Sequence, residues 1–184
     1  MKGLKFMKKL GFTLAEVLIT LVIIGVIAAM TVPTLMNNTN AQEFRSALKK
    51  AISSLNQAIE KEYAMEGLNV GDFSTKTKLI DDLFGKNLQV IEKTGDKFIT
   101  ADGMIFTVTQ FTPNSCDFEN QTACGTIEID VNGEKGPNMK TDNASHPRDQ
   151  YVVQLYSQRA VAGDGATQQV MYDKPTKTSN TTGG

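Results

Sequence analysis

Residues 8–29 read KKLGFTLAEVLITLVIIGVIAA: two lysines, a Gly-Phe junction and an apolar run that continues to Pro33. One carboxylate, that of Glu16, interrupts this run near its start. A charge at the centre of a membrane-spanning helix costs about 2.5 kcal/mol or more, so a lone Glu in such a segment is by default a functional residue with a partner. Nothing inside the segment can neutralise Glu16, so the sequence predicts a partner from elsewhere.

The length of the apolar run separates the ordinary interpretations of this segment. A secretory signal peptide has an apolar core of about 7 to 15 residues before a small-residue cleavage site. Here the run is about 20 residues long, which is enough to cross a bilayer. A plain signal anchor explains that length and the lysines, which would face the cytoplasm. It gives no reason for Glu16 or for the junction of Gly11 and Phe12.

The order of these features resembles the amino-terminal signal of type IV prepilins and type II secretion pseudopilins. The resemblance implies that a membrane peptidase cuts between Gly11 and Phe12, which makes residues 1–11 a leader, and that the new amino terminus of Phe12 is N-methylated. It also implies that Glu16 aligns each subunit against the amino terminus of a neighbour during filament assembly. Gly25 and Pro33 stand where that family often loosens or kinks its helix, as a Gly and a Pro do on physical grounds.

The same resemblance implies partners and a location. The partners are a prepilin peptidase and methyltransferase, an assembly platform protein, further copies of this chain and other pilin-like subunits. The location is the bacterial cytoplasmic (inner) membrane, crossed once, with the globular domain outside the cytoplasm and the filament in the periplasm or on the surface. The sequence does not separate a secretion pseudopilus from a surface pilus. The alternative function is a membrane-anchored binding module that does not polymerise and displays the loop between Cys116 and Cys124 and residues 134–149.

Composition excludes some classes of function. Loss of the leader removes four lysines, leaving 15 of the 19 basic side chains against 20 acidic ones, a formal charge of −5. That balance argues against direct binding of nucleic acid, which needs clustered Lys and Arg. No nucleophile elbow, phosphate-binding loop or HExxH motif occurs, so we expect no enzyme.

Beyond Pro33 a helical pattern continues. Apolar residues recur at spacings of three and four, the stripe of an amphipathic helix, at Phe44, Leu48, Ile52, Leu55, Ile59 and Tyr63. Gly67 is its natural end. We therefore expect one long helix that crosses the membrane, or lies in the filament core, over residues 12–33 and packs on its own domain over residues 34–67.

Residues 68–172 are expected to form the globular domain. A short helix is predicted from Thr75 to Phe84, ended by Gly85. Strands follow, with turns at Asp102-Gly103 and Asn132-Gly133, over residues 88–92, 97–101, 104–109, 126–131, 151–156 and, last, 168–172. The predicted fold is α+β and pilin-like, with the long helix packed on an antiparallel sheet of about four strands. Residues 173–184 are expected to be a flexible tail.

Cys116 and Cys124 are the two cysteines, eight positions apart in a polar stretch. In an exported domain the default is a disulfide that closes this loop. No histidine pair lies near them, so a zinc site is not expected.

The segment 130–138 looks like a loop that recurs in pilin-like and pseudopilin-like proteins. Hard oxygen ligands on a turn-rich segment suit calcium, and the candidates are Asp130, Asn132, Asn138 and Asp142. The loop departs from the EF-hand pattern, with Lys135 where that pattern needs Gly and Thr141 where it needs the bidentate Glu. The alternative is two turns and no ion, and this is the interpretation that we favour.

Overall fold

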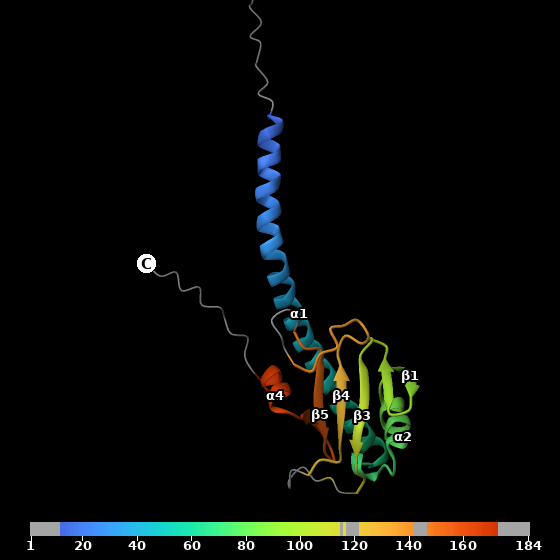
Figure 1. The fold of residues 1–184 in the computed structure, drawn as a ribbon. Helices are drawn as coiled ribbons and strands as arrows, with labels where there is room; N and C mark the ends of the chain where they lie inside the picture. Colours follow the sequence, from blue (N-terminus) through green and yellow to red (C-terminus); the bar gives the residue numbers. More distant parts are fainter. Residues whose placement is uncertain (1–11, 115, 117–121, 142–146, 173–184) are drawn as a thin grey trace, which may run out of the picture. The chain divides into compact units, whose positions relative to one another are not determined.

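The computed structural model describes residues 12–114, 116, 122–141 and 147–172. The proposed leader, residues 1–11, and the proposed tail, residues 173–184, lie outside the described residues. The chain forms two compact units, Met1–Thr39 and Asn40–Gly184. Helix α1, Leu14–Glu66, contributes residues to both units (Figure 1).

In the second unit, α1 buries the apolar stripe that its spacing predicts. Leu48, Leu55 and Ile59 are fully buried, and Phe44 is 7 % exposed. Tyr63, the last predicted member of the stripe, is exposed instead. The helix ends as predicted at Gly67, whose φ of 70° suits a glycine and whose N–H donates to the carbonyl of Tyr63 at 3.0 Å.

The sheet has six antiparallel strands in sequence order, where the sequence predicted about four (Figure 1). They are β1 (Val90–Thr94), β2 (Lys97–Thr100), β3 (Ile105–Phe111), β4 (Gly125–Asp130), β5 (Gln150–Leu155) and β6 (Ala160–Ala162). Strand β6 was not predicted, because three residues are too few to show a period. Two hydrogen bonds join β6 to α1. The Asn56 amide donates to the carbonyl of Ala160 at 3.0 Å and accepts from the N–H of Ala160 at 2.8 Å.

Alternation along the strands places one face of the sheet against the helices. In β4, Ile127 and Ile129 are fully buried, as their spacing predicts. The core continues into stacked aromatic rings, with centroids 5.4 Å apart for Phe84 and Phe98 and 4.9 Å apart for Phe98 and Phe106. The α+β class, with an amino-terminal helix and an antiparallel sheet, is confirmed.

Between α1 and the sheet, the predicted short helix is longer and less regular than expected. It comprises α2 (Lys76–Lys78), the π-helical η2 (Leu79–Phe84) and α3 (Gly85–Asn87), after the 3₁₀ turn η1 (Val70–Asp72). Gly85 was wrongly predicted to end it: its φ is −66°, and its N–H donates to the carbonyl of Ile80, five residues back.

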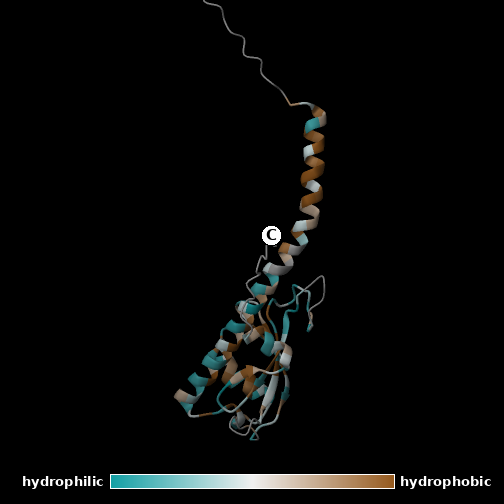
Figure 2. Cartoon of the chain, turned by 90° about the vertical axis from the view of Figure 1, so that its left-hand side faces the viewer, coloured by the Kyte–Doolittle hydropathy of each residue, from teal (hydrophilic) through white to brown (hydrophobic). Residues whose placement is uncertain are grey.

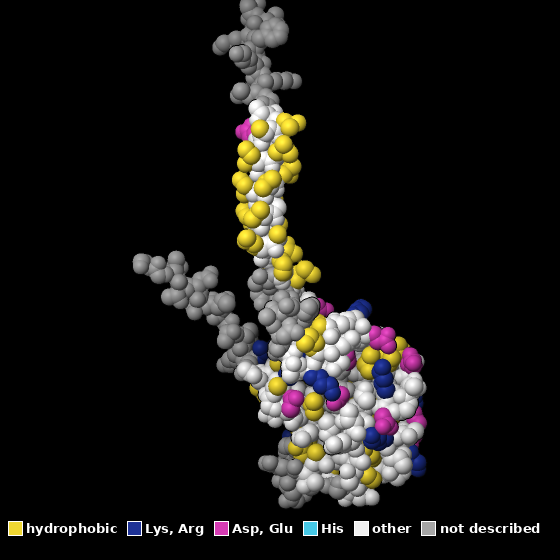
Figure 3. Space-filling model, in the orientation of Figure 1, with side chains coloured by type: hydrophobic (Ala, Val, Ile, Leu, Met, Phe, Trp, Pro, Cys, Tyr) yellow, Lys and Arg dark blue, Asp and Glu magenta, His cyan; other side chains and the backbone are white. Residues whose placement is uncertain are grey.

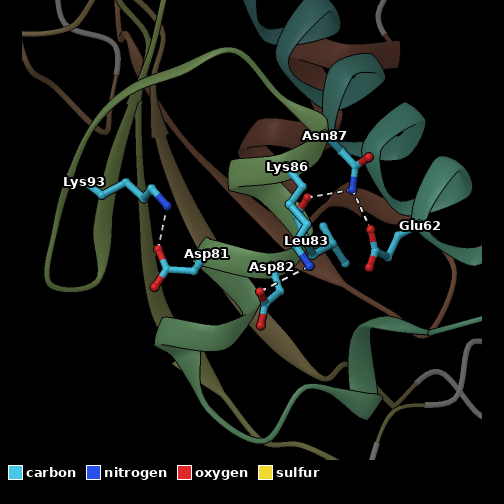
Figure 4. A network of polar contacts seen from close by, with 7 residues as sticks. All are labelled: Glu62, Asp81, Asp82, Leu83, Lys86, Asn87 and Lys93. Carbon is cyan, nitrogen blue, oxygen red and sulfur yellow. Dashed lines mark hydrogen bonds and ion pairs between the residues drawn. The ribbon is translucent and has the colours of Figure 1, made fainter. Parts of the chain in front are cut away.

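The helix ends instead at Asn87, whose amide joins it to α1. This amide donates to the buried Glu62 carboxylate at 2.6 Å and to the carbonyl of Leu83 at 2.9 Å (Figure 4). Two exposed ion pairs, Lys86 with Asp82 and Lys93 with Asp81, lie nearby. Because Glu62 and Asn87 lie far apart in the sequence, no local pattern could have predicted this end.

The predicted last strand, 168–172, is wrong: these residues belong to helix α4, Gly165–Tyr172. The Asp164 carboxylate accepts from the N–H of Thr167, which caps the helix start. The buried Thr167 hydroxyl accepts from the N–H of Val152 on β5 at 3.1 Å. This contact and the packing of Val170 and Met171 against the core hold the segment as a helix beside the sheet.

Candidate functional site

The helix start places the Glu16 backbone against Thr13. The N–H of Glu16 donates to the Thr13 hydroxyl at 3.2 Å and to the Thr13 carbonyl at 3.1 Å. The spacing Thr-x-x-Glu is that of a capping box, and half of that motif is formed here. A carboxylate in the first turn is also favoured by the helix dipole. The helix dipole thus favours the charge of Glu16 at this position, whereas the hydrogen bonds to Thr13 use only its backbone N–H.

The Glu16 side chain is exposed. Within the described residues it takes part in no ion pair and in no side-chain hydrogen bond. The second arm of the capping box, from its carboxylate back to the N–H of Thr13, is not formed there. The carboxylate is thus available to a group from another molecule.

Around Glu16, the first unit exposes its apolar side chains. Leu14–Pro33 is 20 residues long and apolar enough to cross a membrane, and the described residues bury none of it. Leu14 is 80 % exposed and Ile24 63 %. Figure 2 shows the hydrophobic colouring of this part of α1, and Figure 3 shows hydrophobic side chains over the face that it presents. A contiguous apolar surface of this kind requires a membrane or a protein partner.

Gly25 and Pro33 both lie within α1. A Cβ added at Gly25 would meet nothing within 4 Å, so no contact inside the described chain requires a glycine there. Pro33 has no N–H to donate to the carbonyl four residues earlier, which weakens the helix at that point. The predicted kink at these two residues stays a prediction.

The predicted disulfide between Cys116 and Cys124 is confirmed. It is seated against the 3₁₀ turn η1: a Cβ added at Gly71 would lie 2.7 Å from the Cys116 Sγ, and the N–H of Asn114 donates to the Gly71 carbonyl at 2.9 Å. Residues 117–121 of the enclosed loop lie outside the described residues. The ends of the loop are thus tied to the domain.

The predicted calcium ligands Asp130, Asn132 and Asn138 lie in and after the end of β4, and Asp142 is outside the described residues. The Asp130 carboxylate accepts from Gln150 Nε2 at 3.0 Å and from the N–H of Asn132 at 3.3 Å. The Asn132 amide donates to the carbonyl of Gly136 at 2.7 Å. The Asp130 carboxylate therefore already accepts hydrogen bonds within the chain, and a calcium ion here stays a prediction that we do not favour.

Sequence reasoning missed the carboxylate that organises this segment, Asp149. It is fully buried and accepts from the N–H groups of Asn138 at 2.8 Å and Met139 at 2.6 Å. Burial, together with the nearby charge of Asp149, raises the pKa of Asp130 above its ordinary value. Among the described residues, no group of three or more His, Cys, Asp or Glu side chains could hold a metal ion.

Comparison with known proteins adds one finding. Neither the curated proteins nor the solved structures contain a match to this chain. A family model, the prokaryotic N-terminal methylation motif, matches residues 6–32, a range that includes Phe12, Glu16 and Gly25. This motif marks structural pilin-like subunits and implies processing by a prepilin peptidase and assembly at the membrane. The chain thus carries the prepilin-type signal of type IV pilins and pseudopilins.

Proposed function

We propose that this protein is a structural subunit of a type IV pilus-like or type II secretion pseudopilus filament. In this proposal it is inserted in the bacterial cytoplasmic membrane, cut after Gly11 and N-methylated on Phe12. The observation that carries the proposal is the methylation motif at residues 6–32, on a helix whose apolar side chains have no cover within the described chain. The role is structural and not catalytic.

The apolar surface of residues 14–33 explains how the same segment can lie both in a membrane and in a filament. In the membrane, lipid covers it; in a filament, the same segments of other copies cover it, so apolar contact is exchanged and not lost. The charge of Glu16 differs, because lipid cannot neutralise it. The positively charged amino group of Phe12 in a neighbouring subunit would neutralise the Glu16 charge. The attraction between the two charges would be strong in surroundings of low dielectric constant.

The first experiment is an intact mass and amino-terminal peptide analysis of the protein from membranes of its native host. We expect residues 1–11 to be absent and Phe12 to carry a methyl group. An uncut amino terminus, or a cut beyond Ala29, would contradict the proposal. It would then favour the alternative, a membrane-anchored binding module that does not polymerise.

The second experiment separates the two uses of Glu16. Glu16→Gln keeps the length and polarity of the side chain and removes its charge. If the charge pairs with a neighbour, Glu16→Gln and Glu16→Ala should both insert and be cut normally, and both should lower filament yield about 100-fold or more, because breaking a buried pair costs about 3–5 kcal/mol.

Thr13→Ala is the matched control. It removes the hydroxyl that accepts from the N–H of Glu16 and leaves the charge, and a lost cap costs about 1 kcal/mol, so filament yield should fall about fivefold or less. Filament yield is measured by shearing and immunoblotting of cells in which all variants are equally expressed. Normal assembly of Glu16→Gln would show that the charge of Glu16 is not needed for contact with a neighbouring subunit.

A further inference from the structure

A cavity of about 300 Å³ lies in the second unit, where α1, the start of β5 and α4 meet. Its wall combines two guanidinium groups with an aromatic ring, an amide and aliphatic groups. These come from Arg45, Arg148, Tyr151, Gln169, Ala166 and Val170. The lining contains no carboxylate among the described residues. The cavity is therefore both positively charged and partly apolar.

Arg45 is the first reason to expect an anion there. Its side chain is half-buried, and its Nε is fully buried without a hydrogen-bond acceptor in the described part of the chain. Arg45 also takes part in no ion pair with any described residue. A buried donor without an acceptor costs free energy, and a guanidinium requires several acceptors in its plane.

Arg148 brings a second guanidinium to the same wall and holds it in place. Its side chain is buried, its Cζ lies 4.8 Å from the centroid of the Tyr151 ring, and its Nη1 donates to the carbonyl of Lys140 at 3.4 Å. The neighbouring Asp149 is directed elsewhere, to the N–H groups of Asn138 and Met139. The two guanidinium groups give this wall a positive charge, which favours an anion as its ligand.

We infer that this cavity receives a carboxylate side chain from a second copy of the chain. The inference rests on the proposed filament function. Guanidinium groups bind carboxylates in their plane through two parallel hydrogen bonds. The aliphatic walls suit the methylene groups that carry such a carboxylate.

The chain itself supplies suitable carboxylates. The segment after the expected cut has five more acidic than basic side chains. Four exposed glutamates have neither an ion pair nor a side-chain hydrogen bond within the described residues: Glu43, Glu60, Glu66 and Glu134. A cavity on one copy that takes a glutamate from a different patch of the next makes a head-to-tail contact, which can repeat along a helical filament.

Charge reversal tests this contact in the full chain in its native host. Arg45→Glu should lower filament yield about tenfold or more, as expected when one partner of a desolvated charge pair is lost. Lys49→Glu is the matched control, because Lys49 is an exposed cation on the same helix outside the cavity lining, and its yield should stay within about twofold of the wild type. One of the four glutamates, changed to Gln, should lower filament yield as much as Arg45→Gln does, and the two changes combined should lower it no further.

A photoreactive amino acid at Ala166, an exposed residue of the cavity lining, tests the same contact by cross-linking. This measurement does not require filaments. It should cross-link two copies in membranes through a peptide that contains the glutamate identified by its Gln variant, and Arg45→Glu should abolish the cross-link. Assembly of Arg45→Glu at the wild-type level, an unchanged filament yield for all four Glu→Gln variants, or cross-linking to lipid alone would overturn the inference. In each of these outcomes filaments of the wild-type chain would leave the proposed function intact. An uncut precursor that forms no filaments would overturn the proposed function instead.

Discussion

The two halves of α1 have opposite relations to their surroundings. Over Leu14–Pro33 the apolar residues lie on every side of the helix, and none is buried by the part of the chain that the structure describes. Over the part in the second unit they form one stripe, and Leu48 and Leu55 on that stripe are fully buried. An all-round apolar helix needs an apolar medium on all sides, whereas a striped helix needs one packing face. The pattern thus tells which half finds its partner inside the chain and which half requires other molecules.

This difference separates two kinds of free energy. Burial of the stripe contributes to the free energy of unfolding of the domain, because the covering sheet belongs to the same chain. Burial of the Leu14–Pro33 surface contributes to insertion in lipid or to assembly with other copies. Substitutions in the two halves should therefore affect different measurements.

The largest expected effect comes from truncating one leucine in each half. Leu55→Ala should lower the free energy of unfolding of the domain by about 2–5 kcal/mol, because it leaves a cavity in a fully packed core. Leu21→Ala, at a site that is 60 % exposed, should change it by less than about 0.5 kcal/mol. Urea unfolding of the full chain in detergent micelles, followed by circular dichroism, measures both. Equal losses in the two variants would contradict the division of α1 that we describe.

A smaller effect on the free energy of unfolding is expected from the disulfide, which lies in the globular domain and not in α1. Replacing Cys116 and Cys124 together with Ser opens a loop with a sequence separation of eight. The chain-entropy estimate for so short a loop is roughly 2.5 kcal/mol. The same urea titration should show that loss, while extraction of membranes with carbonate should still find the protein fully inserted. A variant that also leaves the membrane would show that the two halves are not independent.

The smallest expected effect is a pH dependence of the free energy of unfolding of the domain in the second unit. The folded-state pKa of Asp130 is raised by burial and by Asp149, so the folded state holds its proton more tightly than the unfolded state. Its contribution to stability is fully present below its unfolded-state pKa, near 4, and is lost as pH rises through the higher folded-state value. As pH rises through that folded-state pKa, the Asp130→Asn variant should therefore become more stable than the wild type. The difference in the free energy of unfolding should be less than about 1 kcal/mol after solvent screening.

Asp102 is the control of opposite sign. Burial alone would raise the pKa of Asp102, but the Thr100 hydroxyl and the Lys50 ammonium, whose Nζ lies 2.9 Å from its carboxylate, together hold that pKa below its ordinary value. Its contribution is present above the unfolded-state pKa and is lost as pH falls through the folded-state pKa. Asp102→Asn should therefore lose stability at neutral pH and match the wild type in acid. Thermal unfolding between about pH 2 and pH 7 brackets both pKa values.

The same thermal unfolding, repeated with millimolar calcium and with a chelator, tests the predicted ion. We expect the midpoint for the wild type to be unchanged, because the Asp130 carboxylate already accepts hydrogen bonds from Gln150 and Asn132. A ligand that binds only the folded state raises that midpoint. A rise with calcium in the wild type, absent in Asp130→Asn, would establish a cation site on this loop.

Prediction from sequence succeeded where the periodic spacing of apolar residues, or a rule about neighbouring residues, determines the local structure. The stripe on α1, its end at Gly67, the alternation of Ile127 and Ile129 and the disulfide all followed from local spacing or from the class of compartment. It failed at residues 168–172, because a cap at Asp164 and the contact between Thr167 and Val152 hold a helix there. It also missed β6, which depends on the amide of Asn56 more than 100 positions away.

The sequence by itself determined the amino-terminal segment, because a lone Glu, a Gly-Phe junction and an uninterrupted apolar run are read without knowing what they touch. Only the tertiary structure decided that Asp149 organises the segment after β4, that Glu62 binds Asn87 and that Arg45 and Arg148 line one cavity. The physical reason is the range of the interaction. Solvation and helical periodicity act on neighbouring residues, whereas hydrogen bonds and charges between distant residues exist only after the chain has brought them together.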